Sequence, residues 1–175
     1  MTEKTCCVTG HRDIPAEQID AVKYALWREI IKAVSDGYTG FMTGFADGAD
    51  QYFAEMVVKL QEDFPNLRLI AVLPYRKRVD SLESREQTKA LLHACADVVV
   101  IQEEYKPNVY AKRNRYMVEH SDRVIAVYDG RDKGGTVSTI RMVHAQRKEM
   151  REVPVGSYLP ENMINLGYFR NASGR

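Results

Sequence analysis

The stretch RVIAVYDGRDKGGTVSTI, residues 123–140, decides the fold. Its first half, 123–129, is an apolar run of β-forming residues, and apolar residues recur at helical spacing from residue 137 onward. A glycine-containing turn joins the two. Apolar runs that are nearly continuous, rather than alternating, are typical of strands that helices cover on both faces. The stretch therefore predicts a strand, a turn and a helix, with the turn at the carboxyl end of a buried parallel strand.

The same alternation continues in both directions along the chain. The pattern predicts further strands at 5–9, 39–44, 67–74 and 97–101, and a short last strand at 152–158. It predicts helices at 16–35, 49–61, 83–94, 109–120 and 137–151. The runs LIAV and VVVI within 67–74 and 97–101 again indicate burial on both faces. We predict one α/β domain over 1–160, a Rossmann-like, doubly wound, mainly parallel sheet with helices on both faces, and a C-terminal tail at 161–175.

The composition narrows the class of protein. The 175 residues are 45% hydrophobic, which is enough for one core, and the net charge of +1 argues against a broad nucleic-acid surface. The three cysteines, Cys6, Cys7 and Cys95, lie in or beside apolar runs, as buried thiols of a reducing compartment do. Because no Cys or His pair has ligand spacing, we predict no metal site. No apolar run approaches the roughly 20 residues that span a bilayer, so we expect a cytoplasmic protein with no membrane contact.

Glycine, arginine and hydroxyl residues gather where the predicted strands end. The segments TGHRD (9–13), TGFADGAD (43–50), PYRKR (74–78) and DGRDKGGT (129–136) each follow a strand. Ligands bind outside the carboxyl ends of the strands in such sheets, and helix N-termini and glycine turns suit phosphate. The candidate ligand-binding residues here are Thr9, Gly10, His11, Arg12, Thr43, Gly44, Asp47, Gly48, Asp50, Arg76, Gly134, Gly135 and Thr136.

Each of these features also has a purely structural interpretation. Thr136 could cap a helix after a tight turn, and Asp47 or Asp50 could cap the helix predicted at 49–61. Arg12 and Arg76 could be solvated surface charges. Their placement after successive strands favours a shared anion site. Neither the G-x-G-x-x-G dinucleotide fingerprint nor a G-K-[ST] phosphate loop occurs, so both standard nucleotide motifs are excluded.

The segments VTGHR, TGFADGAD and RVIAVYDGRDKGGT resemble the YpsA-like family of small bacterial proteins. That family belongs to the SLOG superfamily, together with the DNA-processing protein DprA (Smf) and the LOG (Lonely Guy) proteins. The resemblance covers roughly residues 5–156. It implies a Rossmann-like fold and a pocket for a nucleotide or nucleotide-derived ligand, in a family whose members are largely uncharacterised. Superfamily relatives often dimerise, which makes a homodimer one expectation.

LOG proteins are similar to this chain and cleave the N-glycosidic bond of nucleoside monophosphates. The resemblance places Arg113 at the LOG arginine and residues 134–136 at the glycine-threonine turn. Where LOG enzymes carry the glutamate needed for hydrolysis, this chain has Thr139. A threonine cannot act as a carboxylate base, so LOG-type hydrolysis would need another group. The candidates for a catalytic role are Asp50, Arg113 and His11.

Three functions remain open at this point. The first is a binding or sensing module for a nucleotide-derived ligand. The second is a hydrolase or transferase that uses a carboxylate such as Asp50. The third is DprA-like binding of single-stranded DNA, against which the charge balance and the single domain count. No cofactor is predicted beyond the nucleotide-like ligand itself.

Overall fold

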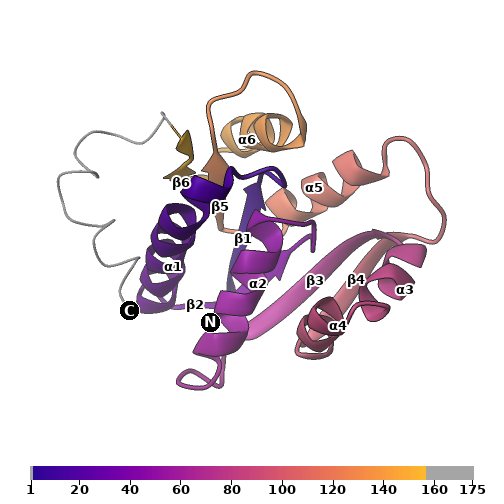
Figure 1. The fold of residues 1–175 in the computed structure, drawn as a ribbon, viewed down its shortest axis with the longest axis horizontal. Helices are drawn as coiled ribbons and strands as arrows, with labels where there is room; N and C mark the ends of the chain where they lie inside the picture. The colour runs from indigo at the N-terminus through magenta and orange to yellow at the C-terminus, as the bar shows by residue number, and fades with distance from the viewer. Residues whose placement is uncertain (1, 157–175) are drawn as a thin grey trace.

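The computed structural model describes residues 2–156 and has a single six-stranded sheet at its centre. All strand pairs are parallel, in the order β4-β3-β2-β1-β5-β6 (Figure 1). The strands are β1 (Lys4–Gly10), β2 (Tyr38–Thr43), β3 (Arg68–Tyr75), β4 (Asp97–Gln102), β5 (Arg123–Tyr128) and β6 (Glu149–Pro154). The predicted Rossmann-like α/β fold is therefore confirmed.

Helices cover both faces of the sheet. The helical segments are η1 (Ala16–Gln18), α1 (Ile19–Ser35), α2 (Ala49–Leu60), α3 (Lys77–Glu83), α4 (Glu86–His93), α5 (Val109–Glu119) and α6 (Gly135–Ala145). Helices α1 to α4 lie on one face, and α5 and α6 lie on the other (Figure 1). Within residues 2–156, none of the helices is long and apolar enough to cross a lipid bilayer. The predicted tail at 161–175 lies outside the described residues.

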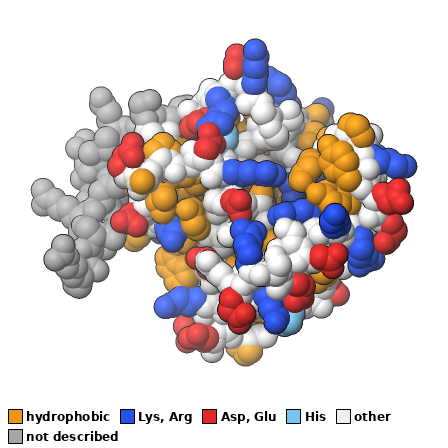
Figure 2. All heavy atoms as spheres, turned by 45° about the vertical axis from the view of Figure 1, so that its right-hand side comes forward, with side chains coloured by type: hydrophobic (Ala, Val, Ile, Leu, Met, Phe, Trp, Pro, Cys, Tyr) orange, Lys and Arg blue, Asp and Glu red, His pale blue; other side chains and the backbone are white. Residues whose placement is uncertain are grey.

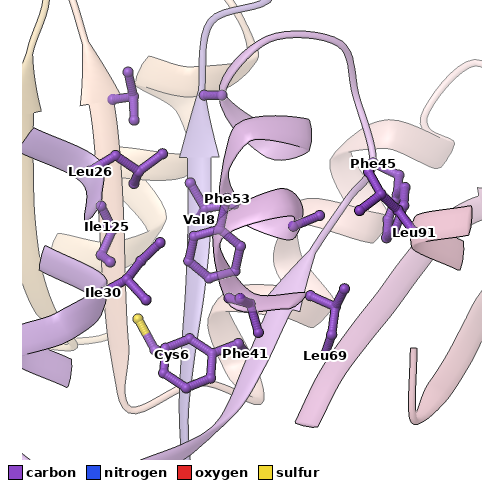
Figure 3. Close-up of a cluster of buried hydrophobic side chains, with 14 of the residues drawn as sticks. Cys6, Val8, Leu26, Ile30, Phe41, Phe45, Phe53, Leu69, Leu91 and Ile125 are labelled. Carbon is purple, nitrogen blue, oxygen red and sulfur yellow. The ribbon is translucent and has the colours of Figure 1, made fainter. Parts of the chain in front are cut away.

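The hydrophobic core has two halves, one on each side of the sheet. Neighbouring residues of a strand point to opposite faces, so Cys6 belongs to the half beneath α1 and α2, and Cys7 to the half beneath α5 and α6. The larger half contains Phe41 and Phe53, whose ring centroids are 6.0 Å apart (Figure 3). Burial on both faces explains the continuous apolar runs of the central strands.

The edge strand β4 differs from its prediction. Its VVVI run suggests burial on both faces, yet Val98 is 43% exposed and the next three residues are only partly buried. The reason is position: β4 is the edge of the sheet and pairs only with β3. An apolar run alone does not separate an edge strand from a central one.

Two predicted helices also differ from the structure. The helix predicted at 83–94 corresponds to α4, which begins at Glu86 because the backbone of Arg85 is extended, and the short helix α3 before it was not predicted. The helix predicted at 137–151 ends at Ala145, and Glu149–Pro154 pairs with β5 as a sixth strand. The break falls at Arg147, whose φ of 53° is left-handed. Pairing with the edge of β5 outweighs the helical preference of these residues.

Candidate functional site

A cleft of about 450 Å³ opens at the carboxyl ends of β1 and β5. The chain builds β2, β3 and β4 on one side of β1, then returns to place β5 and β6 on the other. This reversal in strand order leaves a crevice between the loops that follow β1 and β5, where doubly wound sheets bind ligands. The strand order of the sheet therefore determines where the cleft lies.

The turn before α6 forms one wall of the cleft. Gly134 is the residue before the helix and has a φ of 114°, which favours glycine. A Cβ atom placed on Gly134 would meet nothing within 4 Å, and one on Gly135 would meet only the Asn114 amide nitrogen at 3.9 Å. No side chain caps the helix, so no capping side chain satisfies its first N–H groups. Such a turn suits an anion.

Arg113 on α5 forms the facing wall and is only 6% exposed. Its Nη1 donates to the carbonyl of Gly44 at 2.7 Å, and its Nε donates to Oδ1 of Asn114 at 2.8 Å. Burial lowers the pKa of the guanidinium, and the nearby Asp50 opposes that effect. A charged group held this firmly in a cleft suits bidentate contact with an anion.

Asp50, in the first turn of α2, also lines the cleft and is 6% exposed. Its Oδ2 accepts a hydrogen bond from the N–H of Ala46 at 3.2 Å. Burial raises the pKa of this carboxyl, whereas Arg113 acts to lower it. Asp50 therefore balances the buried charge of Arg113 inside the site.

His11 joins the loop after β1 to the loop after β5. It is 6% exposed, and its Nε2 accepts from the N–H of Asp129 at 3.2 Å and lies 3.1 Å from the Asp129 carboxylate. Burial lowers the pKa of His11, and Asp129 acts against that shift. These contacts give the histidine a structural task at the mouth of the cleft.

Arg131 closes a second link between the same two loops. Its Nη2 pairs with Asp13 at 3.2 Å and with Asp129 at 2.6 Å. The hydrogen bond from Arg131 lowers the pKa of Asp129 to about 2. The residues inserted in this turn relative to the LOG pattern, 131–133, thus bring Arg131 and Lys133 to the cleft.

The structure brings most of the predicted site residues together. Thr9, Gly10, His11, Arg12, Asp50, Arg113, Gly134, Gly135 and Thr136 all line the cleft. Thr136 is buried in the first turn of α6 and is not the cap. The remaining predicted residues do not line it: Thr43, Gly44, Asp47, Gly48 and Arg76.

The residues outside the cleft have other contacts. Arg76 pairs with Glu103 at 3.0 Å on the surface, and Asp47 accepts from Gln51 at 2.8 Å. Thr43 is buried and donates to the carbonyl of Asp50 at 3.0 Å. Gly48 precedes α2 with no side-chain cap, so neither Asp47 nor Asp50 caps that helix. Thr43 thereby ties the end of β2 to the first turn of α2, which carries Asp50.

Sequence reasoning missed eight residues that line the cleft: Val8, Asp13, Ala46, Tyr110, Asn114, Met117, Arg131 and Lys133. Three of the four residues that α5 contributes, Tyr110, Asn114 and Met117, were not predicted, although with Arg113 they share one helical face. Their spacing of three and four positions in the sequence was the signal that could have identified them. No sequence signal indicates the ion pair between Asp13 and Arg131, because these residues lie 118 positions apart in the chain.

Thr139 occupies the position where the LOG resemblance expects glutamate. It is 3% exposed, and its hydroxyl donates to the carbonyl of Gly135 at 2.8 Å, within its own helix. Asp50 is the carboxylate that reaches the cleft from the opposite face of the sheet. No group of three His, Cys, Asp or Glu residues in the described part of the chain is arranged to hold a metal ion.

The fold resembles solved structures at low sequence identity. The molybdenum cofactor carrier protein MCP from Chlamydomonas reinhardtii superposes with a TM-score of 0.54 at 11% identity, over 96% of this chain and 85% of that one. The X-ray structure of TM1055 gives a TM-score of 0.53 at 16% identity, over 84% of this chain and 72% of that one. At these identities the likeness shows the fold.

Relatives are also found at the level of sequence. A UPF0398 protein of Ligilactobacillus salivarius (strain UCC118) is 26% identical over 147 residues, which are 78% of this chain and 80% of the relative. The uncharacterized SPbeta prophage-derived protein YoqJ of Bacillus subtilis (strain 168) is 31% identical over 110 residues, 55% of this chain and 64% of the relative. The YpsA model, described as the YspA SLOG family, matches residues 6–156, so the resemblance drawn from the motifs is confirmed. This chain belongs to the YspA SLOG family.

Proposed function

We propose that this protein binds a nucleotide or nucleotide-derived ligand in the cleft at the ends of β1 and β5, as a binding or sensing module. One observation carries the proposal. The open glycine turn at the start of α6 faces the buried guanidinium of Arg113 within one cleft. A phosphate between them would meet helix N–H groups on one side and a charge-assisted donor on the other.

The other side chains of the cleft suit the remainder of such a ligand. Arg12 and Lys133 add positive charge, and the amide of Asn114 can donate to or accept from a base or sugar. Membership of the SLOG family supports a small ligand at this place. The neighbour from Chlamydomonas is described as a cofactor carrier, which favours binding without turnover in this fold.

Hydrolysis or group transfer on the same ligand is the second candidate. The observation in its favour is Asp50, a buried carboxyl in the cleft whose pKa burial raises, as general acids and bases require. If Asp50 performs catalysis, Asp50→Asn abolishes product formation and leaves ligand affinity largely intact. If Asp50 only balances Arg113, the substitution changes affinity and stability, and no product forms with either protein.

Thermal unfolding with a ligand panel tests the proposal. The panel contains nucleoside monophosphates, ADP-ribose, NAD and cyclic dinucleotides, because a ligand that binds only the folded state raises the melting temperature. Gly135→Asp should abolish the shift, since the carboxylate enters the space expected for phosphate. Ser138→Asp is the matched control: it adds the same charge to an exposed position in the same helix. The proposal fails if no member of the panel shifts the folded protein.

A further inference from the structure

Three tyrosines form a strip that leads out of the cleft. Tyr75 ends β3, Tyr105 lies in the loop after β4, and Tyr110 is in the first turn of α5. The ring centroids of Tyr75 and Tyr105 are 5.5 Å apart, and those of Tyr75 and Tyr110 are 6.4 Å apart, both edge to face. Because Tyr110 lines the cleft, this tyrosine shelf (Tyr75, Tyr105 and Tyr110) continues its wall toward solvent.

The outer end of the tyrosine shelf is open. Tyr105 is 60% exposed, more than Val98 at 43% or Phe64 at 41%, the next most exposed large apolar side chains in the described part of the chain. The inner end is packed, since the rings of Tyr75 and Tyr110 meet edge to face. An ordered aromatic platform with an exposed outer ring is a surface on which another flat ring can stack.

Arginines accompany the tyrosine shelf. The guanidinium carbons of Arg12 and Arg113 each lie 5.7 Å from the centroid of the Tyr110 ring. Figure 2 shows hydrophobic side chains beside a run of Lys and Arg side chains on the face turned forward. Aromatic rings alternating with arginines accept bases and phosphates in turn.

We propose that the tyrosine shelf is a second binding subsite, which stacks an aromatic base that is joined through phosphate to the nucleotide in the cleft. The preferred ligand then contains two nucleosides, not one. This inference rests on the proposed function of the cleft. Arg12 would contact the linking phosphates, and Tyr105 would carry the second base.

A single strand of nucleic acid is the competing occupant, and the surface favours it less. Strand-binding proteins extend a positive groove over several nucleotides, with a ring for each of successive bases. Here the net charge is +1 and the shelf exposes one ring strongly. The shelf also begins at a bounded cleft, which suits a ligand of defined length.

Calorimetric titration with two matched ligands tests the inference. Diadenosine diphosphate and ADP-ribose share an adenosine, two phosphates and a second ribose, and differ by the second base; their guanosine counterparts form a second pair. The base-bearing member should bind about tenfold more tightly or better, and Tyr105→Ala should remove that difference. Tyr105→Phe should retain it, since the ring remains. Phe64→Ala is the matched control, an exposed aromatic residue remote from the cleft lining.

The outcomes separate this inference from the proposed function. If both ligands bind equally and Tyr105→Ala changes neither, the second subsite is wrong and the cleft function stands. If no ligand of either pair binds while another member of the nucleotide panel does, the second subsite is overturned and the cleft function stands; if no member of the panel binds either, both are overturned. If Tyr105→Ala weakens an oligothymidylate in a steeply salt-dependent way but not the dinucleoside diphosphate, the shelf serves a strand and the inference is overturned.

Discussion

Two glycines beside the cleft should respond oppositely to the same added methyl group. A Cβ on Gly44 would lie 2.0 Å from Nη1 of Arg113, whereas one on Gly135 enters open space. Gly44→Ala must displace a buried, hydrogen-bonded guanidinium, so we expect a loss of about 1–3 kcal/mol in the free energy of unfolding. Gly135→Ala should leave stability equal or up to about 1 kcal/mol higher, because alanine favours the helix. Urea denaturation measures both values.

The same pair of variants should both weaken ligand binding, for different reasons. In Gly44→Ala the arginine is misplaced, while in Gly135→Ala the methyl group occupies the space above the turn. A Gly135→Ala protein that is stable and binds as well as the parent would contradict the position assigned to the phosphate. A Gly44→Ala protein of unchanged stability would show that Arg113 is less firmly held than its contacts indicate.

His11 should make stability depend on pH in the weakly acidic range. Burial lowers its pKa from the ordinary value of 6.5, so the unfolded chain binds the proton more readily than the folded one. The free energy of unfolding should therefore fall as pH falls through about 6.5. His11→Gln places an acceptor near the position of Nε2, where the N–H of Asp129 donates, and cannot titrate. Urea denaturation at pH 7.5 and 5.0 should show a smaller loss for the variant, and equal losses would contradict the prediction.

Of the two links between the loop before α6 and the loop after β1, the one formed by Arg131 and Asp13 is exposed. Arg131 and Asp13 are 39% and 69% exposed at the side chain, so their ion pair contributes little to global stability. We expect Asp13→Ala to change the free energy of unfolding by less than about 1 kcal/mol. Hydrogen exchange at residues 129–134 should nevertheless become faster, because the loop loses its partner. If the exchange rates at 129–134 do not change, the contact between His11 and Asp129 is sufficient to hold the loop.

The helices and strands show where sequence reasoning is strong and where it fails. Apolar spacing predicts the central strands and the helices α1, α2 and α5 correctly, because packing on the sheet favours the same structure as the local sequence does. The residues 146–151 prefer a helix locally, yet β5 offers an unpaired edge and Glu149–Pro154 joins it. That choice depends on a strand more than twenty positions earlier in the chain, which a local pattern does not contain.

The candidate site shows the same division. Glycines and arginines after successive strands predict the position of the cleft, because parallel strands bring their carboxyl ends to one edge. The pattern does not say which of those loops reach the crevice beside β1. Arg76 follows β3, which lies two strands away from β1, and it pairs with Glu103 instead of reaching the cleft. Strand order decides this difference, and strand order is a property of the whole sheet.

The edge strand β4, at one end of the sheet, should be where copies of the chain associate at high concentration. β4 pairs with β3 alone, carries four consecutive apolar residues, 98–101, and leaves Val98 43% exposed. An unpaired apolar edge without an internal charge is a template for pairing with another strand.

Val98→Lys should change the free energy of unfolding by less than about 0.5 kcal/mol, since the side chain is already exposed to solvent. It should also reduce concentration-dependent association in sedimentation velocity. Ile31→Lys, at a position 38% exposed on α1, is the matched control. If both variants associate as the parent does, another surface mediates the contact.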